Sequence, residues 1–333
     1  MSEPSPVAFV EAALAYQKTA AIKAAVDLDL FTLVAGGRHD VEELAAVTNS
    51  KLRGLRILCD YLTVHGFLEK NGEHYTVTPL SRAFLDRRSP HYMGSIVDFH
   101  AAPEMCELFL SDPVAFVRNG GSVGLGSVAP DHPVWRAFAQ GMAAIMAPVA
   151  DAVARRISRW PTPPRKILDI AAGHGVFGIA VARALPDARL VAVDWPAILE
   201  IAASNAAAAG VAGRFTALPG DAFEIEWDRD FDLVLLPNFL HHFDHTTCVR
   251  LLRKVRLSLA PGGKTLAVEF VPNEDRVSPP FQASFAFYML GSTPKGDAFT
   301  VSDLAAMARE AGFSGASVAP LGRSPQSLVT FED

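Results

Sequence analysis

From residue 166 onward, short apolar runs alternate with helical segments, and this alternation restricts the folds open to the chain. Residues 166–170 and 190–194 form the first two runs, and each precedes a segment with helical spacing, at 176–185 and 196–209. Further strands are expected at residues 215–218, 232–236 and 265–270. Strands that alternate with helices assemble into a parallel sheet with helices on both faces. We therefore predict an α/β domain in this part of the chain.

The last two apolar runs have a different connection. Residues 316–321 and 326–331 are joined by a Gly-Arg-Ser-Pro turn at 322–325, which is too short for a parallel crossover. The last strand should therefore run antiparallel to its neighbours. The predicted fold class is α/β, a Rossmann-like parallel sheet with an antiparallel C-terminal strand.

The sequence before residue 160 is mainly helical. Helical spacing covers residues 7–30, 41–48 and 51–65. Two β-like runs within residues 66–77 flank Asn71–Gly72, a dipeptide suited to a tight hairpin. Two helices followed by a β-hairpin are the pattern of a winged helix. Helical sequence resumes from about 100 to 159, interrupted by a glycine-rich loop at 120–126.

A proline-rich segment at 160–164 is the sharpest break in composition, because prolines cannot continue a helix. A chain of 333 residues is long for one hydrophobic core. We predict a winged-helix domain at 1–100, connecting helices that line a substrate pocket at 101–160, and a cofactor-binding domain at 161–333.

The charge and cysteine content exclude several classes of protein. Nucleic acids and anionic membranes attract basic surfaces, whereas this chain has a formal net charge of −6. Its three cysteines are scattered without a CxxC pair, which is typical of a reducing compartment. Residues 1–10 lack the segments of a signal peptide, and no apolar run is long enough to span a bilayer. We expect a soluble, cytoplasmic protein with no nucleic-acid or membrane partner.

A glycine-rich loop follows the first strand of the α/β domain. It reads DIAAGHGVFG over residues 169–178. Glycines let the backbone approach a nucleotide closely, and the N-terminus of the next helix offers unpaired N–H groups. The pattern also matches the dinucleotide fingerprint, with Asp194 near the distance expected for a ribose-binding carboxylate. An NAD-dependent oxidoreductase is therefore one interpretation.

Two acidic positions favour S-adenosylmethionine over a dinucleotide. Asp169 lies at the end of its strand, four residues before Gly173, where a carboxylate suits the ammonium group of a methionine moiety and repels phosphates. Asp221 and Phe223 follow the third strand, where an acid beside an aromatic ring is suited to bind the adenine amino group and cover its ring. The alternatives are tight packing of the glycines without a ligand, and a helix cap at Asp221.

Four segments together resemble a known family. They are 168–175, 220–223, 240–244 and 259–264, which read LDIAAGHG, GDAF, LHHFD and LAPGGK. From residue 167 to the C-terminus the chain resembles the class I S-adenosylmethionine-dependent methyltransferases. With the N-terminal winged helix, nearly the whole chain resembles the O-methyltransferases of plant phenolics and bacterial polyketides. The resemblance implies S-adenosylmethionine as cofactor, a small hydroxylated acceptor, and a homodimer formed through the winged helix.

The resemblance also implies roles for the cofactor residues. In that family the glycine loop holds the methionine end, and acids at the positions of Asp194 and Asp221 bind the ribose and the adenine. His174 occupies a position commonly held by threonine or serine. The predicted cofactor site consists of Asp169, Gly173, Gly175, Asp194, Asp221, Phe223 and Asn238.

The catalytic histidine of the family falls on His241, which follows the fourth strand at the edge of the sheet where ligands bind. A hydroxyl acceptor needs a base, and histidine is the usual one near neutral pH. Glu269 matches a carboxylate that orients this histidine. The chain departs from the family at His242 and Phe243, where aspartate and tryptophan are usual, and at Ala298, where a second carboxylate is usual. A relative that binds the cofactor but performs decarboxylation or hydroxylation is therefore the alternative function.

An aromatic-rich helix is predicted at residues 281–290. Phe281, Phe285 and Met289 are spaced to share one face, and the same spacing relates Met142 and Met146. Such faces either pack in a core or line a pocket. We predict that Met142, Met146, Phe285 and Met289 line the pocket of a flat, apolar acceptor that carries a hydroxyl group.

Two other interpretations have little support in the sequence. His241 and His245 have the i, i+4 spacing of metal ligands on a helix, but no further ligand set is evident, and we expect no metal. A winged helix also occurs in DNA-binding regulators. Residues 37–85 contain six Lys or Arg and six Asp or Glu, which is no basic footprint.

Overall fold

In a computed structural model, the chain forms two compact units, Met1–Cys106 and Glu107–Asp333. The structure describes residues 5–122, 133–322 and 324–332, and along 133–140 it describes the helix without its side chains. Each unit has a hydrophobic core of its own. Residues 107–160 group with the C-terminal unit. In the described part of the chain, no helix combines the length and hydropathy needed to cross a bilayer.

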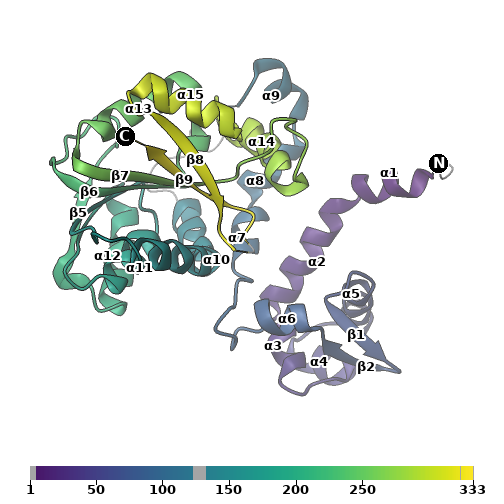
Figure 1. Cartoon of the computed structure of the whole chain (residues 1–333). Coiled ribbons are helices and arrows are strands. Elements are labelled where there is room, and N and C mark those ends of the chain that lie inside the picture. The colour runs from purple at the N-terminus through teal and green to yellow at the C-terminus, as the bar shows by residue number, and fades with distance from the viewer. Residues whose placement is uncertain (1–4, 123–132, 323, 333) are drawn as a thin grey trace. The chain divides into compact units, whose positions relative to one another are not determined.

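The N-terminal unit consists of helices and a two-stranded hairpin, which lies at its edge (Figure 1). Its elements are α1 (Pro6–Ala13), α2 (Ala15–Asp27), α3 (Leu30–Ala35), α4 (Val41–Val47), α5 (Leu52–Val64), β1 (Leu68–Asn71), β2 (His74–Val77), α6 (Pro79–Phe84) and α7 (Ile96–His100). Apolar side chains of α2 to α5 pack with Leu68 and Tyr75 of the hairpin. The predicted winged helix is confirmed.

The hairpin turn lies one residue later than predicted. Asn71 pairs with His74, so the two-residue loop is Gly72–Glu73 and not Asn71–Gly72. Gly72 has a φ of +61°, and Glu73 is not among the residues with positive φ. A positive φ at the first loop position only is the pattern of a type II′ turn, which favours glycine there.

The C-terminal unit is a seven-stranded sheet with helices on both faces (Figure 1). Its strands are β3 (Lys166–Ile170), β4 (Arg189–Asp194), β5 (Phe215–Pro219), β6 (Phe231–Pro237), β7 (Leu259–Glu269), β8 (Gly315–Pro320) and β9 (Ser327–Glu332). Its helices are α9 (Pro113–Asn119), α10 (Pro133–Ile157), α11 (Val176–Ala184), α12 (Pro196–Ala208), α13 (His245–Arg256), α14 (Pro280–Ser292) and α15 (Val301–Ala311). Helix α8 (Pro103–Leu110) spans the division between the two units.

The strand order is β5-β4-β3-β6-β7-β9-β8. Strand β9 pairs antiparallel with β7 and β8, and the other neighbouring strands in the sheet pair parallel. The predicted parallel sheet with an antiparallel last strand is therefore confirmed. Side chains of α10 and α11 pack on one face, and side chains of α13 and α15 pack on the other.

Strand β7 begins earlier than predicted, at Leu259 instead of residue 265. The pairing of β6 with β7 is irregular near its start, with a register shift between Phe231 and Leu233. Gly263 lies in this irregular part, where a Cβ atom would be 2.5 Å from the carbonyl oxygen of Phe231. Prolines and glycines that indicate a turn in sequence thus belong to a bulged strand.

The glycine-rich loop predicted at 120–126 lies, beyond Ser122, outside the described residues. Gly120 ends α9 with a φ of +68°. The proline-rich segment at 160–164 forms bends between α10 and β3, as its composition indicates.

Candidate active site

The predicted site residues gather where the parallel strands end, which is the edge at which open α/β sheets bind ligands. Asp169 is the penultimate residue of β3, and Asp194 ends β4. Asp221 follows β5, whereas Asn238 and His241 follow β6. Glu269 ends β7, beside β6 in the sheet.

The glycine loop has left-handed backbone conformations that favour glycine. Gly173 has a φ of +57° and Gly175 one of +74°. The N–H group of Gly173 donates a 2.7 Å hydrogen bond to the Asp194 carboxylate, which ties the loop to the end of β4. Gly178 lies so close to the sheet that a Cβ atom would be 2.6 Å from the side chain of Leu190. Gly178 therefore serves helix packing, as the alternative without a ligand supposes.

Asp169 is a fully buried acid with one satisfied oxygen. Its Oδ2 accepts a 3.0 Å hydrogen bond from the N–H group of Gly178, whereas Oδ1 has no partner among the described residues. Burial raises the pKa of Asp169 to about 7, and the charge of Asp194 adds to the shift. A buried carboxylate oxygen without a partner is costly, and a cationic group would satisfy it. Asp169 therefore fits the ammonium group of a methionine moiety.

His174 is buried within the glycine loop. Its ring Nδ1 accepts a 3.2 Å hydrogen bond from the N–H group of Val176, the first residue of α11. Burial lowers the pKa of His174 to about 4, so the ring is neutral near pH 7. His174 thus accepts a hydrogen bond from one of the backbone N–H groups at the helix N-terminus that have no partner within the helix.

Asp194 and Asp221 each bind the backbone that follows their strand. The Asp194 carboxylate accepts hydrogen bonds from the N–H groups of Gly173 and Trp195, and burial raises its pKa. The Asp221 carboxylate accepts a 2.8 Å hydrogen bond from the N–H group of Phe223. This bond holds the Asp221 carboxylate next to the backbone of Phe223, in the loop after β5.

Phe223 belongs to a cluster of three phenylalanines. Its ring centroid is 4.9 Å from that of Phe243, in an edge-on arrangement, and 6.2 Å from that of Phe239. Phe239 and Phe243 flank the short 3-10 helix η3 (Leu240–His242), which contains His241. The cluster joins the loop after β5 to the turn after β6.

Asn238 and Met146, predicted for the cofactor and the acceptor respectively, lie together. The Nδ2 atom of Asn238 is 3.6 Å from the Sδ atom of Met146, and its Oδ1 accepts a hydrogen bond from the side chain of Gln326. Asn238 also has a φ of +55°. Gln326 is buried, and sequence reasoning missed it because it follows a turn far along the chain.

His241 and Glu269 are the best-defined pair of the site. Both are buried, and Nδ1 of His241 lies 2.5 Å from Oε2 of Glu269. The other carboxylate oxygen accepts hydrogen bonds from the N–H groups of Phe239, at 3.2 Å, and Leu240, at 2.9 Å. The acid thus fixes both the imidazole ring and the backbone that carries it. His242, in contrast, is exposed.

Aromatic side chains cover the other side of His241. The ring of Phe285 contacts the imidazole edge-on, with centroids 4.9 Å apart, and Phe270 lies 4.2 Å from Phe285. Phe270 follows Glu269 directly, which is a signal that sequence reasoning did not use. Phe281 is 63 % exposed, and Met289 is buried at 1 %. The three residues predicted to share one helix face therefore differ in their surroundings. Phe281 is exposed to solvent, Met289 is buried, and Phe285 contacts His241.

Met142 is partly buried and packs against the core on the α10 face, and Met146 is buried in it. The two methionines therefore contribute to the core, and through Met146 to the contact with Asn238.

The structure gives no support to a shared helix face for His241 and His245. His241 lies in η3, whereas His245 is the first residue of α13 and its Nε2 lies 3.0 Å from a carboxylate oxygen of Glu310. Within the described ranges, no cluster of three or more His, Cys, Asp or Glu is arranged to hold a metal ion.

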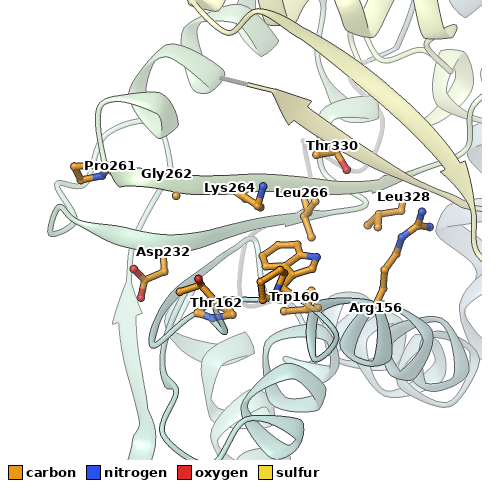
Figure 2. Close-up of a pocket in the computed structure, with 14 residues that line it drawn as sticks. Arg156, Trp160, Thr162, Asp232, Pro261, Gly262, Lys264, Leu266, Leu328 and Thr330 are labelled. Carbon is orange, nitrogen blue, oxygen red and sulfur yellow. The ribbon is translucent and has the colours of Figure 1, made fainter.

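A cavity of about 440 Å³ lies away from these residues, near the start of β6 (Figure 2). Trp160, Asp232, Lys264 and Leu266 are among its lining residues. Two of its charged groups have protein partners: Lys264 lies over the Trp160 ring, and Asp232 accepts hydrogen bonds from the N–H groups of Arg165 and Lys166. Because ligands of open α/β sheets bind at the carboxyl ends of strands, we assign no catalytic role to this cavity.

Comparison with known proteins gives a consistent result. The O-methyltransferase domain family matches residues 109–314, and the O-methyltransferase dimerisation domain matches residues 10–87. A phenazine O-methyltransferase from Lysobacter antibioticus is 30 % identical over 77 % of this chain and 76 % of its own length. An S-adenosyl-L-methionine-dependent methyl transferase from Serratia is 26 % identical over 92 % of this chain and 90 % of its own.

Among solved structures, a candidate O-methyltransferase from Nostoc punctiforme superimposes with a TM-score of 0.94. It is 43 % identical in sequence, and the match covers 100 % of both chains.

Proposed function

The chain belongs to the O-methyltransferase family, and from this premise we propose that it methylates a hydroxyl group of a small aromatic acceptor with His241 as general base. As a member of that family it is an S-adenosylmethionine-dependent enzyme. The contact between His241 and Glu269, beside the ring of Phe285, is the observation that carries the proposal.

The cofactor, when bound, supplies a methyl group on a sulfonium, which is a good leaving group. The protein then has to bind, align and remove a proton. In the proposed arrangement, the unpartnered oxygen of Asp169 binds the ammonium group, and Asp194 binds the ribose hydroxyls. Asp221 binds the adenine amino group while Phe223 covers the ring.

His241 takes up the proton of the acceptor hydroxyl. When the N–H group at Nδ1 donates a hydrogen bond to Glu269, the lone pair of the imidazole is on Nε2. Nε2 is then the nitrogen that accepts the proton of the acceptor hydroxyl. The two N–H groups that bind Glu269 keep the carboxylate in place. The histidine is thereby held in the tautomer that a general base needs.

The aromatic residues around His241 favour a flat acceptor. Phe270 and Phe285 form one wall, and the ring of Tyr288 continues it with its centroid 5.8 Å from that of Phe285. Stacked and edge-on contacts with such side chains stabilise planar aromatic molecules. Phenazine, in the name of one relative, is a molecule of this kind.

The dimerisation domain supports a homodimer, and α1 is suited to take part in it. None of its residues is buried, and its apolar side chains include Phe9, which is 75 % exposed. In Figure 1, α1 extends beyond the other helices of the N-terminal unit. A second copy of the chain would cover this apolar surface.

The proposal is tested by assaying methyl transfer from S-adenosylmethionine to a panel of hydroxylated aromatic compounds, with product identification by mass spectrometry. We expect one or more O-methylated products, a fall in kcat of about 10²- to 10⁴-fold in His241→Ala, and near-normal activity in the control His91→Ala, at an exposed position of the N-terminal unit. Full activity in His241→Ala would refute the role of this residue. A decarboxylated or hydroxylated product without methylation would instead establish the alternative chemistry.

A further inference from the structure

Helix α13 contacts both the turn that contains His241 and the loop that carries Asp221 and Phe223. It begins at His245, directly after the Asp244 cap and the turn that contains His241. The thiol of Cys248 in its first turns donates a 3.2 Å hydrogen bond to the carbonyl oxygen of Leu240, the residue before His241. The N-terminal part of α13 is therefore attached to the catalytic turn.

Two cationic residues further along α13 attach it to the loop after β5. Arg250 places its guanidinium 4.9 Å from the centre of the Phe223 ring. Lys254, one turn later, donates hydrogen bonds through Nζ to the carbonyl oxygens of Ala222, at 2.9 Å, and Ile225, at 2.5 Å. The same ammonium lies 4.0 Å from the centre of the Trp227 ring.

The loop at residues 220–227 needs such support. It contains no helix or strand, although it carries both Asp221 and Phe223. Its carbonyl groups lack the regular partners that a sheet or helix provides, and a partly buried ammonium with three donors binds two of them and a ring. Burial lowers the pKa of Lys254, and the nearby acids, of which Asp221 is the first, oppose this shift.

We propose that Lys254 is a positioning residue for the 220–227 loop and thereby sets the selectivity of the enzyme for the adenine base. The inference rests on the proposed assignment of Asp221 and Phe223 to adenine. Lys254 does not contact the base in this arrangement. It fixes the backbone on both sides of Phe223, so that the Asp221 carboxylate and the Phe223 ring keep a constant separation.

The test compares two ligands that differ only at the base. Dissociation constants of S-adenosylhomocysteine and S-inosylhomocysteine, in which an oxygen replaces the adenine amino group, are measured by calorimetry on the full-length protein. We expect Lys254→Met to weaken binding of S-adenosylhomocysteine about tenfold, because a hydrogen bond to a charged group is lost at each of two carbonyls. S-inosylhomocysteine should lose less, so the ratio of the two constants falls towards one.

A matched control distinguishes loop positioning from general damage to α13. Arg253 lies on the same helix and donates two hydrogen bonds to the carbonyl oxygen of Glu310, away from the 220–227 loop. Arg253→Met should retain the wild-type ratio. In Lys254→Met, kcat at saturating cofactor and its dependence on pH should also stay unchanged, because His241 and Glu269 are not touched.

Each outcome is decisive for one assignment. A wild-type ratio in Lys254→Met, or equal losses in Lys254→Met and Arg253→Met, would overturn the role of Lys254. The variant Asp221→Asn tests the adenine assignment separately. If it retains the wild-type ratio, Asp221 does not read the base, whatever the result at Lys254.

Discussion

The Nδ1 atom of His241 lies 2.5 Å from Oε2 of Glu269, and the same carboxylate binds the backbone N–H groups of the two residues before the histidine. One side chain thus orients the imidazole ring and anchors the turn on which it stands. An acid at the end of β7 is well placed for both, because β7 lies beside β6 in the sheet. The pair therefore depends on the sheet order as much as on the two residues.

Replacing Glu269 by glutamine should alter the protonation of His241 with little change in shape. The amide retains an oxygen for the N–H groups of Phe239 and Leu240, but it turns an NH₂ group towards Nδ1. The ring proton then moves to Nε2, which can no longer accept a proton. We expect kcat to fall about 10²- to 10⁴-fold while the affinity for S-adenosylhomocysteine stays within about threefold. A kcat close to that of the wild type would contradict the orienting role.

Asp169→Asn should raise stability above pH 7 and weaken cofactor binding. The pKa of Asp169 is about 7 in the folded protein and about 3.9 in an unfolded chain. Between these values the folded state binds more protons, so the free energy of unfolding falls as the pH rises. Asparagine removes this loss. Thermal melts without cofactor should therefore show a higher Tm for the variant at pH 8 and a similar one at pH 4.

The cofactor supplies the second measurement on Asp169. Wild-type affinity for S-adenosylhomocysteine should rise between pH 5.5 and 7.5 as the carboxylate ionises, and Asp169→Asn should bind at least about tenfold more weakly at the higher pH. The exposed residue Asp187 gives a control, since Asp187→Asn should change neither property. Unaltered binding by Asp169→Asn would remove this residue from the methionine site.

His174 should make the protein sensitive to acid. Its pKa is about 4 when folded and about 6.5 when unfolded, so the unfolded state binds more protons between these values. The stability contributed by the neutral ring is complete above pH 6.5 and is lost as the pH falls towards 4, by up to about 3 kcal/mol. His174→Asn, whose side chain still accepts from the N–H group of Val176, should lose less. Urea unfolding from pH 4 to 7 measures this, with His91→Asn, at an exposed position, as control.

Gly296→Ala should displace the backbone of His241. The N–H group of Asp297 donates a 3.0 Å hydrogen bond to the carbonyl oxygen of His241, and a Cβ atom on Gly296 would clash with that oxygen and with Oγ1 of Thr293. We expect kcat to fall at least about tenfold, with a stability loss of about 1–3 kcal/mol. Gly213→Ala, where a Cβ atom meets nothing within 4 Å, should leave the rate unchanged. Steady-state kinetics that do not separate the two variants would show that the turn at 293–297 does not position the histidine.

Phe9→Asp should weaken the proposed dimer. A charge on the exposed apolar surface of α1 would have to be desolvated by the partner. Light scattering should show a shift towards monomer at micromolar concentration. Val277→Asp, a similarly exposed position in the other unit, should have no effect, and an equal shift in both variants would argue against an interface at α1.

The sheet was predictable because its signals are local. Strand β3 begins and ends at the predicted residues, 166 and 170, since a buried apolar run there is bounded by prolines and by a glycine loop. The start of β7 was not predictable in this way. Proline and glycine at 261–263 have the composition of a turn, and only the neighbouring β6 strand holds them in a bulge.

Within the site, the sequence indicated residues but not the contacts that support them. Helical spacing gave Phe281, Phe285 and Met289 a common direction, but burial along α14 depends on what each turn meets, and only Phe285 contacts His241. The bonds from Lys254 to the 220–227 loop and from Asp297 to His241 leave no periodic pattern. They arise from the packing of elements that are distant in sequence.

The position of β9 has a consequence for the order in which the chain is completed during synthesis. Among the strands of the described residues, β8 pairs with β9 alone, and β9 lies between β8 and β7. Strand β8 therefore has no place in the sheet until residues 327–332 have been added and have reversed direction. A chain interrupted before Ser327 would expose the edge of β7 and leave β8 unpaired, and such unprotected edges recruit strands from other molecules. For an incomplete nascent chain, aggregation at this edge is thus the expected fate.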